Sequence, residues 1–124
     1  MLHAAWATGS PWPAASQDEL ADLVVGRRPF PSAALTWAIV GLLTSAAGIT
    51  AAASTTASHR RWVRLGARGV GTALLARGVG GLVVSGNQIA DSTAVYRHTD
   101  LRIYSPLCLV LGAAAMESVH RGAR

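Results

Sequence analysis

The stretch LGARGVGTALLARGVGGLVVSGNQIA, residues 65–90, carries only two charged residues and decides the fold of the chain. As a helix it is long enough to cross a hydrocarbon core of about 30 Å at about 1.5 Å per residue. Arg68 lies near one end, where a long side chain reaches the interface. Arg77 lies near the centre, where a guanidinium costs at least about 3 kcal/mol unless it is paired or hydrated. The stretch therefore predicts a membrane-spanning helix whose central cation needs a partner.

The composition supports the same class. The 124-residue chain is 51% apolar and only 14% charged, which is too few charges for an ordinary soluble surface, so we predict a single membrane domain over residues 1–124. The net charge of +5 does not indicate a nucleic-acid partner, because the basic residues, all Arg, flank apolar stretches and form no basic stripe. Cys108 is the only cysteine, so no intramolecular disulfide and no cysteine-based metal site is predicted; no metal or cofactor is expected.

Three stretches are predicted to be transmembrane helices. The first lies within residues 30–58, which contain no charge at all, and the second contains Arg77. The third is marginal and is opened by Ser105-Pro106, a helix-start signal. These spans are placed at residues 32–57, 63–88 and 103–120. The predicted fold is an all-α, small polytopic transmembrane bundle, with residues 87–102 as a polar connector before the last span.

The chain before the first span is predicted to be a helix remnant and a connector. Residues 1–12 are interpreted as the outer end of a truncated first helix, because a membrane helix is expected to precede them. Residues 13–31 form an extracytoplasmic connector. Within it, residues 14–25 predict a short amphipathic helix with Ser16 as the cap.

The distribution of arginines orients the bundle. The basic turn at residues 59–64 and the basic C-terminus are predicted to be cytoplasmic by the positive-inside rule. The protein is accordingly predicted to be a multi-pass protein of the inner (plasma) membrane. Six arginines lie inside and four outside under this assignment. The inner set is Arg60, Arg61, Arg64, Arg68, Arg121 and Arg124; the outer set is Arg27, Arg28, Arg97 and Arg102.

Small residues surround Arg77 on its helix face. Gly81 lies one turn away on that face, and two pairs with small-xxx-small spacing let a neighbouring helix come close. These pairs are Ala67 with Gly71 and Gly81 with Ser85. We therefore predict that Arg77 points into the bundle. The weakly hydrophobic second half of the first span, residues 45–58, is likewise predicted to face other helices.

Three motifs resemble one family. They are His3-x-x-Trp6-x-x-Gly9, the LARGVGG stretch at residues 75–81, and the DLRIYSPLCL stretch at residues 100–109. Together they resemble the DUF3995 family of small bacterial membrane proteins, which implies a helical membrane fold of four helices and draws attention to the polar residues of these motifs. The family implies no activity.

These motifs supply the candidate polar site. Asp100 is the natural counter-ion for Arg77, since a guanidinium in a low dielectric seeks a carboxylate, and Asp91 or helix-end carbonyls are competing partners. Cys108, in the first turn of the last helix, is interpreted either as a reactive thiol or as an inert packing residue. The full candidate set is His3, Trp6, Arg77, Asp100, Tyr104, Ser105 and Cys108.

Three interpretations of this set remain open. The first is a buried polar network that fixes helix register, with Trp6 and Tyr104 as interfacial anchors. The second is a non-enzymatic pocket centred on Arg77 that binds a small molecule or a lipid. The third is a small membrane enzyme or carrier that binds an anionic or lipid-like molecule through His3, Arg77, Asp100 and Tyr104, although no set of nucleophile, base and orienting group is visible. The sequence indicates the lipid bilayer as a partner and leaves the oligomeric state open.

Overall fold

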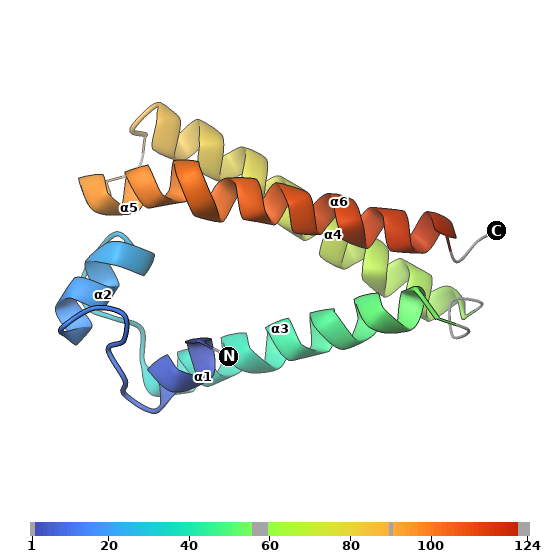
Figure 1. Ribbon diagram of the computed structural model, residues 1–124, viewed down its shortest axis with the longest axis horizontal. Helices are drawn as coiled ribbons and strands as arrows, with labels where there is room; N and C mark the ends of the chain where they lie inside the picture. Colours follow the sequence, from blue (N-terminus) through green and yellow to red (C-terminus); the bar gives the residue numbers. More distant parts are fainter. Residues whose placement is uncertain (1, 56–59, 90, 122–124) are drawn as a thin grey trace.

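The computed structural model describes residues 2–55, 60–89 and 91–121, and every regular element in these ranges is helical (Figure 1). Three helical segments are long and apolar enough to cross a membrane. They are Ala33–Ala53, Arg61–Gly86 and Ala94–Arg121. The predicted fold class, an all-α polytopic membrane bundle, is confirmed. In chain order the elements are α1 (Leu2–Ala7), α2 (Gln17–Val24), α3 (Ala33–Ala53), α4 (Arg61–Gly86), α5 (Ala94–Thr99), the π-helical turn η2 (Asp100–Tyr104) and α6 (Ser105–Arg121).

Helices α4 and α6 pack most extensively, through small residues (Figure 1). A Cβ atom on Gly112 would lie 3.1 Å from the carbonyl oxygen of Gly71, and one on Gly71 would lie 3.2 Å from that of Gly112. The two backbones therefore approach as closely as glycine allows. The predicted small-residue contact face is confirmed, because the buried residues of α4 are Ala67, Gly71, Gly78, Gly81 and Ser85.

Helix α3 approaches this pair through the end of its second half and diverges from it toward its first half (Figure 1). In its second half only Ala53 is buried, where it forms a small cluster with Ala67 and Val119. Leu42, near its middle, is 70% exposed. A Cβ atom on Gly66 of α4 would lie 2.9 Å from Ile49 Cγ2, so the end of this half meets α4 as predicted, while most of its residues stay exposed. Residues 56–58 of the predicted span lie outside the described residues.

The last helix begins earlier than predicted. The sequence indicated a connector through residue 102, but α5 begins at Ala94, and the side chain of Thr93 caps it by accepting a hydrogen bond from the Tyr96 amide. Helical structure is then continuous to Arg121. In the sequence the Thr93 cap looks like part of a loop, because the residues around it are polar. The contacts that Thr93 makes in the folded protein are not visible in the composition.

The π-helical turn has a local cause in Pro106. Proline has no amide hydrogen and its ring crowds the carbonyl four residues earlier, so a regular α-helix is disfavoured there. At this point the Ser105 amide donates to the carbonyl of Asp100, a spacing of five residues that defines a π-turn. The wider turn carries the chain past the proline without ending the helix.

The connector before α3 folds over the start of α5. Helix α2 has the predicted cap, with the Ser16 hydroxyl accepting from the Glu19 amide at 3.2 Å, and Leu20 is fully buried. The Thr93 hydroxyl donates to the carbonyl of Asp22 at 2.6 Å. The hydrogen bond from Arg28 lowers the pKa of the Asp22 carboxyl. Helix α2 is thus joined to the end of the bundle at which α5 begins.

The basic residues at the other end of the bundle come together. Helix α4 begins at Arg61, while Arg121 ends α6, and the antiparallel course of these helices places both at one end (Figure 1). His59 of the predicted basic turn and Arg124 lie outside the described residues.

The close approach of α4 and α6 can be tested with two glycines. We expect Gly112→Ala to lower stability in detergent by about 1–3 kcal/mol, because the new Cβ would lie 2.8 Å from Leu75 Cγ and 3.0 Å from the Leu75 amide nitrogen. Thermal unfolding followed by circular dichroism measures this loss. Gly69→Ala is the matched control, since a Cβ there would contact nothing within 4 Å and alanine favours helix. Equal stability of both variants would contradict the packing described.

Candidate functional site

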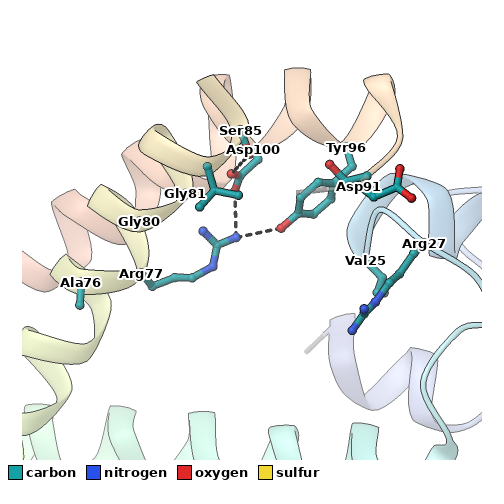
Figure 2. Close-up of a pocket in the computed structure, with 12 residues that line it drawn as sticks. Val25, Arg27, Ala76, Arg77, Gly80, Gly81, Ser85, Asp91, Tyr96 and Asp100 are labelled. Carbon is teal, nitrogen blue, oxygen red and sulfur yellow. Dashed lines mark hydrogen bonds and ion pairs between the residues drawn. The ribbon is translucent and has the colours of Figure 1, made fainter. Parts of the chain in front are cut away.

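Arg77 of α4 is paired with residues of η2 and α5. Its Nη2 atom donates to Asp100 Oδ1 at 2.8 Å and to the Tyr96 hydroxyl at 3.1 Å (Figure 2). Asp100 was the predicted counter-ion, and this pairing is confirmed. The two side chains differ greatly in exposure, with 44% for Arg77 and 1% for Asp100. The carboxylate is enclosed and the cation remains accessible.

Serine side chains surround the carboxylate. The Ser85 hydroxyl donates to Asp100 Oδ2 at 2.5 Å, so each carboxylate oxygen has a donor. Ser105 is fully buried, and its hydroxyl oxygen has no hydrogen-bond partner among the described residues. The contacts from Ser85 and Arg77 stabilise the charged form of Asp100 within the interface.

Gly81 makes room for the ion pair. A Cβ atom there would lie 2.9 Å from Asp100 Oδ2, and it would come closer still to Arg77 Nη1 and Ser105 Oγ. Arg77, Gly81 and Ser85 follow one another at one-turn spacing on α4, so the cation, the gap and the serine donor share one face. The π-turn supplies the opposing carboxylate from its first residue.

Two cavities meet at Arg77. The first, of about 510 Å³, is bordered by Arg77, Asp100 and Tyr96 and also by the charged side chains of Arg27 and Asp91 (Figure 2). The second, of about 260 Å³, lies beside α1 and α3 and is also bordered by Arg77. Apart from Arg77, only Val25 borders both.

The structure distributes the predicted site residues among several places. His3, Trp6 and Tyr104 border the second cavity together with Arg77, whereas Asp100 borders the first. Ser105 lies buried in the helix interface. Cys108 is a half-buried free thiol and borders neither cavity.

His3 and Trp6 form an aromatic wall on the short helix α1. Their rings lie 4.9 Å apart in an edge-to-face arrangement, and the Trp6 indole N–H donates to the carbonyl of Trp12 at 2.7 Å. Burial lowers the pKa of the His3 imidazole, so the ring is neutral at neutral pH. Helix α1 packs against α3, which positions this wall.

Sequence reasoning missed two members of the cluster. The polar composition around Tyr96 indicated a connector, and Ser85 was considered only as a small residue. Tyr96, Asp100 and Tyr104 recur at intervals of four residues, which is the signal that would have found Tyr96 if the helix had been extended upstream. The Tyr96 and Tyr104 rings lie 6.3 Å apart.

Three membrane-length helices, two of them joined by an ion pair with an enclosed carboxylate, define a multi-pass α-helical membrane protein. The family model described as "Protein of unknown function (DUF3995)" matches residues 1–115, and the chain belongs to that family. No curated protein and no solved structure matches the chain.

The ion pair predicts an asymmetric response to mutation. We expect Arg77→Leu to destabilise the protein by about 3 kcal/mol, because it leaves an enclosed carboxylate without its cation. Asp100→Asn is expected to cost less, since the exposed guanidinium can be solvated and keeps Tyr96. The measurement is equilibrium unfolding in detergent micelles.

The double variant Arg77→Leu/Asp100→Asn completes a thermodynamic cycle. It is expected to be more stable than the sum of the two single losses indicates, because the unpaired charge is removed. Strictly additive losses would show that the two side chains do not interact.

Proposed function

We propose that this chain is a non-enzymatic protein of the plasma membrane whose polar pocket, centred on Arg77, binds a small molecule or a lipid. The observation that carries the proposal is the 44% exposure of the Arg77 side chain at the junction of two cavities, although the arginine is already paired. A pair that served only to fix helix register needs no accessible cation, because its hydrogen bonds are made within the helix interface. Exposure of the cation alone favours a binding role.

Unused hydrogen-bond donors support this proposal. Both contacts of the guanidinium use Nη2, and Nε and Nη1 donate to no other described residue. Arginine has five N–H donors in a fixed plane, so a bound acceptor can be added without breaking the pair with Asp100. The pocket therefore includes a preformed site for an oxygen acceptor.

A carrier or enzyme is the second candidate. His3, Arg77, Asp100 and Tyr104 all border cavities that meet at Arg77, which favours a moving or reacting ligand. Catalysis needs an activated nucleophile or a general base close to its target. The Thr36 hydroxyl in the second cavity already donates to the Ser32 carbonyl at 3.0 Å, and Cys108 borders neither cavity. Binding without chemistry is therefore the better supported proposal.

The proposed arrangement in the membrane has three spans, given by α3, α4 and the helix Ala94–Arg121. The connector that contains α2 lies on the extracytoplasmic side in this proposal, and the basic turn and the C-terminus lie in the cytoplasm. The shared location of Arg61 and Arg121 at one end of the bundle supports this orientation.

Retention of a ligand tests the proposed pocket. We expect the protein, purified in mild detergent and examined by native mass spectrometry, to carry an adduct that Arg77→Gln reduces by about tenfold, the effect of losing one charge-assisted hydrogen bond. Arg68→Gln is the control, because Arg68 is an exposed arginine on the same helix. Identical adducts in both variants would argue against a pocket centred on Arg77.

Cysteine labelling tests the orientation. In a Cys108→Ser background, a membrane-impermeant maleimide is expected to label Ala15→Cys in intact spheroplasts, because this position lies in the proposed outer connector. Ser58→Cys and Ala123→Cys are expected to react only after permeabilisation. Labelling of the last two in intact spheroplasts would reverse the proposed topology.

A further inference from the structure

The second cavity differs from the first in its charges. Among the described residues that border it, Arg77 is the only cation at neutral pH, and none is a carboxylate. In the first cavity Asp91 and Asp100 accompany Arg27 and Arg77, so positive and negative groups balance. An anion is repelled by carboxylates in the first cavity and meets none in the second.

The Arg77–Asp100 pair presents its positive end to the second cavity. Asp100 is 1% exposed and does not border this cavity, whereas Arg77 is 44% exposed and does. The pair is neutral as a whole, but only its cationic member borders this cavity. A cation that lies closer to the cavity than its counter-ion attracts a negative group there.

Hydrogen-bond donors are grouped with this positive end. The Tyr104 hydroxyl and the His3 imidazole border the cavity, and neither has a hydrogen bond to another described residue. Trp6 uses its indole N–H on Trp12 and contributes only its ring to the wall. Apolar side chains, among them Phe30 and Ile39, complete the lining. One part of the cavity can therefore bind an anionic head, and the remainder suits hydrocarbon.

The size of the cavity limits the ligand to one chain. At about 260 Å³ it lies below the range of about 300–1,000 Å³ that is usual for drug-sized ligands. It has room for a small head and the first part of one alkyl chain, and it is too small to hold a glycerophosphate head together with the first parts of two chains. The rest of a chain can continue along α3, where Leu43, one turn beyond Ile39, is an exposed apolar residue.

We infer that the second cavity binds a single-chain amphiphile with a carboxylate head, of the fatty-acid class, with the head on Arg77, Tyr104 and His3 and the chain against Phe30 and Ile39. This inference rests on the proposed pocket and specifies its ligand and the cavity it occupies.

Photo-crosslinking in nanodiscs tests the ligand class. The full chain in phosphatidylcholine nanodiscs is incubated with palmitate that carries a diazirine on its chain, and three competitors are added in turn. We expect oleate to abolish crosslinking, oleyl alcohol to need about a tenfold higher concentration because it lacks the charge, and phosphatidylglycerol to have no effect. Equal competition by oleyl alcohol, or stronger competition by phosphatidylglycerol, would overturn the inference.

Two space-filling variants test which cavity is used. Ile39→Trp fills the apolar part of the second cavity and is expected to reduce crosslinking about tenfold, whereas Val84→Trp fills the first cavity and is expected to leave it within twofold. Neither side chain takes part in the ion pair, so the test holds even if Arg77→Gln does not fold. The reverse order of effects would place the ligand in the first cavity and overturn the inference.

The outcome is separable from that of the proposed function. If the purified protein loses an adduct in Arg77→Gln but not in Arg68→Gln, while palmitate crosslinking is unaffected by oleate and by Ile39→Trp, the pocket is real and the ligand class is wrong. If neither experiment depends on Arg77 or on Ile39, both proposals fail.

Discussion

The ion pair between Arg77 and Asp100 is the constraint on which the rest of the structure depends. A guanidinium at the middle of a spanning helix needs a partner. Helix α4 itself supplies no carboxylate, because its described residues include no Asp or Glu. The partner therefore comes from another helix. At 2.8 Å the pair requires the two helices to lie very close, and Gly81 with Ser85 on α4 provides the necessary space. Stability and site geometry thus rest on the same residues.

The π-turn brings the carboxylate to the required position. Pro106 prevents regular α-helical hydrogen bonding just after Tyr104, and the extra residue in the turn changes the direction of the side chains that precede it. Asp100 consequently points into the interface with α4, whereas Tyr104 borders the second cavity. Pro106, which the sequence indicated as part of a helix start, instead lies within a continuous helix and changes the register of its side chains.

Features that depend on charge and residue size were predictable from the sequence, whereas those that depend on tertiary contact were not. The cost of Arg77 indicated a partner, and the spacing of Ala67, Gly71, Gly81 and Ser85 identified the contact face of α4. The start of α5 was not predictable from polarity, because its cap depends on Thr93, whose hydroxyl also binds the Asp22 carbonyl far away in sequence. The separation of the candidate residues into two cavities also required the course of α3, which its composition did not indicate.

Because α3 diverges from α4, the cation of the ion pair remains accessible (Figure 1). If α3 packed along the whole length of α4, it would cover Arg77 and the cation would be as enclosed as Asp100. Instead α3 meets α4 near Ala53 and moves away toward the end where α1 and α2 lie (Figure 1). The second cavity forms in this space, beside Trp6 and Phe30. A third helix that contributes little burial to the bundle therefore forms one wall of the second cavity, which explains why the arginine has one exposed side and one paired side.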